Sequence, residues 1–259
     1  LHIESIAHLS PTEQAVAIHA SGELLQASFN LQQGPLLAVK YFECGDAEPR
    51  LLFALHHLLV DGVSWRVLLD DLELGCRALL AGNNKPAFLH SAPYRHWAEA
   101  LQALARSEAI IRQQDYWLAQ TSAPFNPATL YGQVGAAVRL DFSLDQKRTK
   151  ALLGPAPGKA RAQVDEILLA ALAQTFCTEG RESVVIELEG HGREGESVNL
   201  DLSRTLGWFT SRFPVRLSPG SDDPVRALKA TKEQLRAIPD KGMGYGLLRY
   251  LGDPARKEA

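Results

Sequence analysis

Two histidines and one aspartate stand at a spacing that suits acid–base chemistry. His56 and His57 close the apolar run "RLLFALHH", and Asp61 follows four residues later, directly before Gly62. Because neighbouring strand residues point to opposite faces of a sheet, we expect one imidazole to pack inward and the other to face a cavity. The alternative is a structural histidine pair beside a turn aspartate. No metal site is predicted, since no third ligand has a recognisable spacing.

A second group of titratable side chains, "EGHGRE", covers residues 189–194. In the run that precedes it, apolar residues alternate with Glu187 and Glu189, which fits a strand with one carboxylate face. The glycines on either side of His191 permit a sharp turn that could bring His191 or Arg193 into a site. The alternative is a surface strand end with solvated charges.

Composition excludes several classes of function. The chain has 259 residues, of which 46% are hydrophobic and 22% charged, as is ordinary for a globular protein. A net charge of -3 argues against nucleic-acid binding through phosphate neutralisation. No apolar run approaches the roughly 20 residues of a membrane helix, and no signal peptide opens the chain. Three cysteines without a CxxC pair favour free thiols in a reducing cytoplasm.

Helix and strand patterns alternate along the chain, and "SPTE" at 10–13 is a capping box that predicts a helix start. A proline- and glycine-rich linker is predicted over 121–135. This order favours two α/β lobes, with domains at 1–125 and 126–259. Strands are predicted over 35–43, 50–57, 136–144, 183–189 and 209–217. Further helices are predicted over 64–82, 93–120 (interrupted or not), 164–176 and 223–238.

The motifs resemble those of a known superfamily. "HHLLVDG" resembles the HHxxxDG signature of the condensation superfamily of nonribosomal peptide synthetases, which shares its fold with chloramphenicol acetyltransferase. "EGHGRE", "RTLGWFTSRFPVRL" at 204–217 and "KGMGYGLLRYL" at 241–251 resemble signatures of its epimerization branch, and "DEILLAAL" at 165–172 resembles a further family motif. Both ends of the family domain look cut, since a "PIQ" motif and an "NYLG"-type motif are not found. We therefore expect weak or no activity from these 259 residues alone.

The resemblance implies an α/β fold of two chloramphenicol-acetyltransferase-like lobes, each a mixed sheet with helices, with an active-site tunnel between them. It implies that His57 is catalytic and that Asp61, with Gly62, is mainly structural. Glu189 would be the second acid/base group, although the same turn could deliver His191 or Arg193 instead. We expect Asp61 to pair with Arg66 or Arg212. The other supporting residues are His56, His191, Arg193 and Tyr245.

The implied activity is a cofactor-independent isomerase reaction, the epimerization of the α-carbon of an L-aminoacyl or peptidyl thioester. Such a reaction would supply D-amino acids for antibiotic biosynthesis in the cytoplasm. The substrate would arrive on the phosphopantetheine arm of a peptidyl carrier protein domain, within adjacent synthetase modules. No cofactor of the domain's own, no nucleic acid and no membrane is implied. Two alternatives stay open: peptide-bond formation by a condensation domain, and a catalytically dead module that docks carrier proteins.

Overall fold

The computed structural model describes residues 1–122, 138–139, 141–177, 182–194 and 198–253, which belong to two compact units. The first unit comprises Leu1–Ala98 and Arg193–Thr210, and the second comprises Glu99–Gly192 and Ser211–Ala259. The first unit is thus discontinuous in sequence, and we call Arg193–Thr210 the inserted segment. The boundary predicted at 125/126, with most of the predicted linker, lies outside the described residues, so that division stays a prediction.

Three strands form the sheet of the first unit in the order β1–β2–β3. Strand β1 runs parallel to β2, and β2 runs antiparallel to β3, so the mixed sheet predicted for this lobe is confirmed. The strands are β1 (His2–Ser5), β2 (Leu37–Glu43) and β3 (Arg50–Leu55). The sequence predicted the strands β2 and β3 but not β1, because "HIES" is short and has little apolar pattern.

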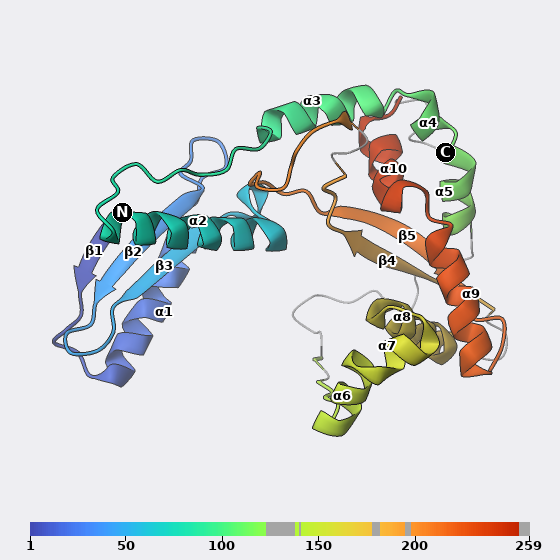
Figure 1. Cartoon of the computed structure of the whole chain (residues 1–259), viewed down its shortest axis with the longest axis horizontal. Coiled ribbons are helices and arrows are strands. Elements are labelled where there is room, and N and C mark those ends of the chain that lie inside the picture. The colour runs from blue at the N-terminus through green and yellow to red at the C-terminus, as the bar shows by residue number, and fades with distance from the viewer. Residues whose placement is uncertain (123–137, 140, 178–181, 195–197, 254–259) are drawn as a thin grey trace. The chain divides into compact units, whose positions relative to one another are not determined.

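Helix α1 (Pro11–Ala27) begins at the predicted capping box and lies along the sheet of the first unit (Figure 1). The Glu13 amide donates to Ser10 Oγ at 3.4 Å, and the Glu13 carboxylate accepts from the Ser10 amide at 2.8 Å. These bonds satisfy two donors that the start of a helix leaves free. The helix contributes Ile18 to a small core of Ile6, Phe42 and Cys44.

Strand β3 leads directly into the HHLLVDG motif. The strand ends at Leu55, two residues earlier than predicted, and a turn of 3₁₀ helix, η1 (His57–Leu59), follows. Helix α2 (Gly62–Leu80) starts two residues before the predicted position because Asp61 caps it. The motif therefore forms the connection between a sheet and a long helix.

The stretch predicted as one long helix, interrupted or not, is three helices. They are α3 (Tyr94–Leu104), α4 (Glu108–Ile111) and α5 (Gln114–Thr121). Ser107 explains the first break, since its side chain accepts a hydrogen bond from the Ile110 amide at 3.4 Å and caps α4.

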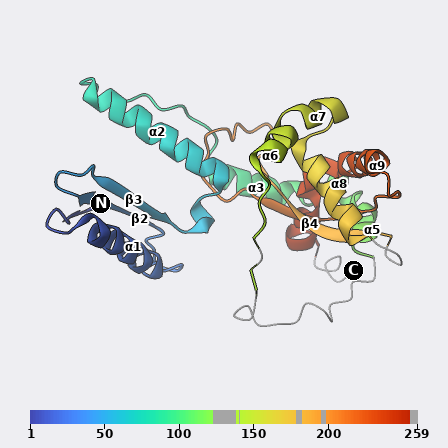
Figure 2. The ribbon, with the colours of Figure 1, turned by 90° about the horizontal axis from the view of Figure 1, so that it is seen from below.

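The second unit packs helices against one apolar sheet face. Strands β4 (Val184–Gly190) and β5 (Ser211–Leu217) are antiparallel, and Phe213, Val215 and Leu217 of β5 are buried in one core with Trp117 of α5. Helices α8 and α9 pack side by side (Figure 2). The remaining elements are α6 (Gln146–Leu153), α7 (Pro155–Ala160), α8 (Val164–Phe176), α9 (Pro224–Arg236), η5 (Pro239–Gly242), α10 (Met243–Gly246) and η6 (Leu247–Leu251).

The strand predicted over 136–144 is wrong where the structure describes it, since residues 138–139 and 141–144 are not in a strand. Val138 and Phe142 are almost fully exposed there, so their alternation with polar residues marks no buried face. The sheet of this unit, as far as it is described, is the antiparallel pair β4–β5, and the parallel strand that a mixed sheet requires is not among the described residues.

Among the described residues, none of the helices combines the length and the hydropathy that crossing a membrane requires.

Candidate active site

The two histidines of the motif have different surroundings. His56 Nδ1 accepts a hydrogen bond from the Leu58 amide at 3.2 Å, and its ring lies edge-on to Phe29 at 6.4 Å between centroids. His57 is exposed, and its ring lies 4.8 Å from the ring of Trp208 between centroids, tilted by 57°. His56 is thus occupied in closing the turn, whereas His57 presents its imidazole to solvent.

Asp61 is a buried structural carboxylate. Its Oδ1 accepts from the Ser64 amide at 2.7 Å, which caps α2, and its Oδ2 accepts from the Phe209 amide at 3.2 Å. Oδ1 also pairs with Arg193 Nη2 at 3.1 Å, and the Asp61 and Arg193 side chains are only 4% and 8% exposed. The carboxylate therefore joins the helix start to the inserted segment of the same unit.

Arg193 completes this buried network. Its Nη1 donates to the carbonyls of Leu202 and Thr205 at 2.9 and 2.7 Å, and its Nη2 also donates to Ser64 Oγ at 2.9 Å. Its guanidinium carbon lies 4.0 Å from the centre of the Phe209 ring, in the range of a cation–π contact. Within the first unit, these contacts hold the inserted segment against the start of α2.

The network sets the ionisation of Asp61. Burial by itself would raise the pKa of this carboxyl, but hydrogen bonds from Ser64, Arg193 and Phe209 outweigh it and lower the pKa below its usual value. Asp61 is therefore a carboxylate at neutral pH, which fits an anion held for structure. Burial raises the pKa of the nearby Tyr94 hydroxyl, and the Asp61 charge raises it further.

The predicted partners of Asp61 are wrong. Arg66 is exposed on α2, and Arg212 belongs to β5 of the second unit, where it pairs with Glu187 and Glu189. Arg193 takes the role because its backbone enters the first unit shortly after strand β4 ends. The expectation that Asp61 is structural and pairs with a basic residue agrees with the structure.

Nothing among the described residues requires the residue after Asp61 to be a glycine. Gly62 is the first residue of α2, its φ is not in the left-handed region, and an added Cβ would meet no described atom within 4 Å. The connection from β3 into α2 is made by η1 and by the extended backbone of Asp61.

The inserted segment contributes residues that sequence reasoning did not single out. Its Gly207 and Phe209 are buried and Trp208 is exposed between them. An added Cβ on Gly207 would lie 2.2 Å from the Tyr94 ring, so this position excludes any side chain. The motif "RTLGWF" was visible in the sequence, but only the fold shows that it packs beside the HHLLVDG turn.

The carboxylate face predicted for the second motif is confirmed. On β4, Glu187 and Glu189 point to the face opposite the core, and both pair with Arg212 of β5. Arg212 forms a close ion pair with Glu187, and its Nε lies 3.7 Å from Glu189 Oε1. Glu189 is the more exposed carboxylate, at 66% of its side chain, and it occupies the last but one residue of the strand.

The residues of the EGHGRE motif belong to two different units. Gly192 adopts a positive φ of 65°, a left-handed backbone conformation that glycine reaches at little steric cost. Arg193 lies in the first unit, whereas His191 is exposed and belongs to the second unit. Of the two residues that the turn was expected to carry inward, only Arg193 has a buried side chain, and it serves the Asp61 network.

Tyr245 lies in α10 of the second unit. Its ring packs 5.6 Å from Trp117 in the core of that unit, and the glycine before it, Gly244, leaves room for the Gln113 side chain. The structure thus gives Tyr245 a packing contact. Its supporting role in the active site stays a prediction.

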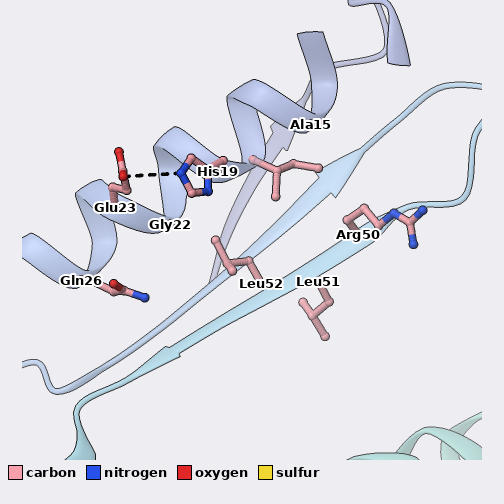
Figure 3. Close-up of a pocket in the computed structure, with 9 residues that line it drawn as sticks. Ala15, His19, Gly22, Glu23, Gln26, Arg50, Leu51 and Leu52 are labelled. Atoms are coloured by element: carbon pink, nitrogen blue, oxygen red, sulfur yellow. Dashed lines mark ion pairs between the residues drawn. The ribbon is translucent and has the colours of Figure 1, made fainter. Parts of the chain in front are cut away.

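A groove of about 690 Å³ lies in the first unit between α1 and β3 (Figure 3). It is lined by apolar side chains such as Leu52, by Arg50 and by the ion pair of His19 and Glu23. None of the residues of the two motifs lines it. Among the described residues, no group of three or more histidine, cysteine or acidic side chains is arranged to hold a metal ion.

Comparison with known proteins identifies the family. The family model of the condensation domain matches residues 1–259. A protein of the linear gramicidin synthase of Brevibacillus parabrevis is 42% identical over 258 residues, which cover 96% of this chain and 5% of that protein. Surfactin synthase subunit 1 of Bacillus subtilis is 38% identical over 93% of this chain and 7% of its own length. The chain thus spans only a small part of the curated relatives it matches.

Solved structures agree with this match. The epimerization domain from the third module of tyrocidine synthetase B superimposes with a TM-score of 0.80 at 31% identity, over 99% of this chain and 60% of that one. The condensation enzyme VibH superimposes with a TM-score of 0.70 at 18% identity, over 99% and 60%, and supports the fold alone. The predicted α/β, chloramphenicol-acetyltransferase-like fold is therefore confirmed. The chain belongs to the condensation-domain family of the nonribosomal peptide synthetases.

Proposed function

We propose that this domain epimerizes the α-carbon of an L-aminoacyl or peptidyl thioester and so yields a mixture of L and D forms. The observation that carries the proposal is Glu189, an exposed carboxylate at the end of β4 in the "EGHGRE" motif. The 31% identity to an epimerization domain supports the same assignment. The thioester would be presented on the phosphopantetheine arm of a carrier protein in the same synthetase.

The chemistry requires two proton-transferring groups. A thioester is less resonance-stabilised than an amide, so its α-proton is comparatively acidic and an enolate can form without a bound cofactor. One group takes the α-proton from one face of the carbon, and a second returns a proton to the other face. A side chain placed for either transfer is typically worth ~10² to 10⁴ in rate.

His57 and Glu189 are the groups that we assign to these transfers. The described residues offer the His57 imidazole no hydrogen bond or ion pair, so both ring nitrogens are open to a substrate. Glu189 is exposed, and its described ion pair is the longer contact to Arg212. His57 belongs to the first unit and Glu189 to the second, so the proposal requires the substrate to meet a side chain from each.

The other motif residues have supporting roles in this proposal. His56 closes the η1 turn, and Asp61 with Arg193 fixes the start of α2, on which the position of His57 depends. Nothing in these roles requires them to contact the substrate.

The test is an assay of the synthetase that contains this domain, with a carrier loaded with an L-aminoacyl group and chiral chromatography of the released product. We expect the L form to become an L/D mixture. His57→Ala and Glu189→Gln should each abolish the conversion. Glu187→Gln is the matched control, because Glu187 shares the strand face but is held in a close ion pair with Arg212, and it should keep most of the activity.

Exchange of the α-proton with deuterated water separates the two transfers. A variant that keeps one base can remove and return the proton on one face, so deuterium enters without inversion. His57→Ala and Glu189→Gln should therefore differ in whether the L or the D substrate exchanges. Undiminished epimerization by Glu189→Gln would refute the two-base scheme.

The same assay distinguishes the other functions. Peptide bonds formed with an acceptor carrier, without any D product, would identify a condensation domain in which Glu189 has no essential part. Binding of the loaded carrier without either product would identify a module that only docks carriers.

A further inference from the structure

One contact of His57 has no part in the reaction as proposed so far. The indole of Trp208 lies 4.8 Å from the imidazole, with the two ring planes tilted by 57°. Trp208 is 42% exposed, although both of its neighbours in the chain are buried. Trp208 belongs to neither of the two apolar cores described above, so its contact with His57 calls for another explanation.

We propose that Trp208 is a positioning residue for His57, whose indole holds the imidazole in one rotamer while leaving both ring nitrogens open. This rests on the proposed function, in which His57 transfers a proton. A proton-transferring group must come within hydrogen-bond reach of its target, and an exposed side chain otherwise samples several rotamers. A hydrogen-bonding partner would also fix the ring, but it would occupy a nitrogen that the reaction uses. An aromatic face restrains the ring without doing so.

The backbone around Trp208 is fixed at three successive residues. The Gly207 amide donates to Ser64 Oγ at 3.1 Å, and the Ser64 hydroxyl donates back to the Gly207 carbonyl at 2.9 Å. The Tyr94 hydroxyl donates to the Trp208 carbonyl at 2.8 Å. The Phe209 amide donates to the Asp61 carboxylate. Such a clamp fixes where the indole projects, as a positioning role requires.

The clamp also gives the motif aspartate an indirect route to the imidazole. Asp61 does not contact the His57 ring among the described interactions, but it holds the amide next to Trp208 and the Arg193 side chain that anchors the inserted segment. Asp61 would therefore act on His57 through Trp208 as well as through the start of α2. The HHLLVDG turn and the "GWF" stretch would then act together to position the His57 imidazole.

The first test measures the contact between the Trp208 and His57 rings by NMR and does not require catalysis. The chain has eight histidines, so the His57 ring signals would be assigned by their loss in His57→Gln, in protein labelled with ¹³C-histidine. A proton above an aromatic ring is shielded, so the His57 ring protons should be shifted upfield in the unchanged protein. Trp208→Leu should remove the shift. Trp208→Phe should keep part of it.

The second test reads catalysis in the synthetase that contains this domain. Misplacement by about 1 Å can cost ~10²-fold in rate, so Trp208→Leu should lower kcat by roughly 10- to 100-fold and leave KM within about twofold. Trp208→Phe should recover most of kcat. Leu206→Ala is the matched control, because Leu206 is a similarly exposed apolar residue of the same segment, and it should change neither constant.

Two results would overturn the proposal. One is a His57 ring without shielding in the unchanged protein, and the other is a kcat for Trp208→Leu equal to that of Leu206→Ala. Failure of the proposed function has a different signature: the unchanged synthetase would form no D product, while the shielding would still report whether Trp208 restrains His57. An unchanged unfolding midpoint in Trp208→Leu, expected for an exposed side chain, would show that lost kcat does not come from lost folding.

Discussion

Replacing Arg193 by methionine should unfold the first unit far more easily than any other single loss of charge there. Methionine keeps most of the side-chain volume but removes four hydrogen bonds, to Asp61, Ser64 and the carbonyls of Leu202 and Thr205. It leaves the Asp61 carboxylate buried with Ser64 and the Phe209 amide as its remaining described donors. The fold would then contain a buried charge without its counter-ion.

The magnitude follows from the burial of the pair. Removing one partner of a buried ion pair costs ~3–5 kcal/mol. Hydrogen bonds to a charged group are worth ~1.5–3 kcal/mol each, but here they share one guanidinium and cannot be added to the first figure in full. We therefore expect Arg193→Met to lower the free energy of unfolding by about 4–5 kcal/mol, which is a large part of a typical ~5–15 kcal/mol.

Arg204→Met is the matched control. Arg204 lies in the same inserted segment and pairs with Asp71, but the two side chains are 21% and 32% exposed. Both side chains reach solvent, so this pair is screened more than the Asp61–Arg193 pair and its loss should cost less, about 1–2 kcal/mol. Both variants would be unfolded in guanidinium chloride, and amide hydrogen exchange would be followed at Ser64 and Phe209. The reasoning fails if Arg193→Met costs no more than Arg204→Met, or if both amides keep their protection.

Three further predictions concern pH and backbone fit. The pKa of Asp61 is lowered from 3.8, so the stability that its ionised carboxylate contributes is fully present above pH 3.8. That stability is lost as the pH falls through the lower pKa of the folded state. In acid titrations below about pH 4, Asp61→Asn should therefore lose stability less steeply than the unchanged protein. In chemical denaturation, Gly242→Ala should lower the free energy of unfolding by about 2–4 kcal/mol, because φ is +90° and the added Cβ would overlap a phenylalanine ring. Gly220→Ala is the control: its φ is +63° but the space around it is open, so it should cost only ~1–2 kcal/mol. Gly207→Ala should lose about 1–3 kcal/mol by overlap with a tyrosine ring, and equal midpoints for this variant and the unchanged protein would contradict that contact.

Local signals in the sequence were sufficient for much of the fold. The capping box at Ser10 predicted the start of α1, and alternation along β4 predicted its carboxylate face, because both depend on residues a few positions apart. The same applies to the strands β2 and β3, which the sequence predicted to within a few residues. The strand predicted over 136–144 failed because alternation alone does not show that a partner surface exists to bury it.

The Asp61 network could not be predicted in the same way. Arg193 is 132 residues away in sequence, and no local pattern distinguishes it from Arg66 or Arg212 as a partner. The contact of Trp208 with His57 depends likewise on the inserted segment joining the first unit. The "GWF" stretch was visible within a family-like motif, but the role of Trp208 depends on the unit with which the stretch packs.

The inserted segment also imposes an order of events on synthesis. A ribosome that has made Asp61 must add 132 more residues before Arg193 exists, and at ~5–20 residues per second this takes roughly 7–26 s. During that interval the Asp61 carboxylate in the nascent first unit has no Arg193 to pair with. The first unit therefore cannot complete its packing before β4 has been translated. A pause in translation at any point before Phe209 would therefore prolong the stage at which the HHLLVDG turn has no clamp.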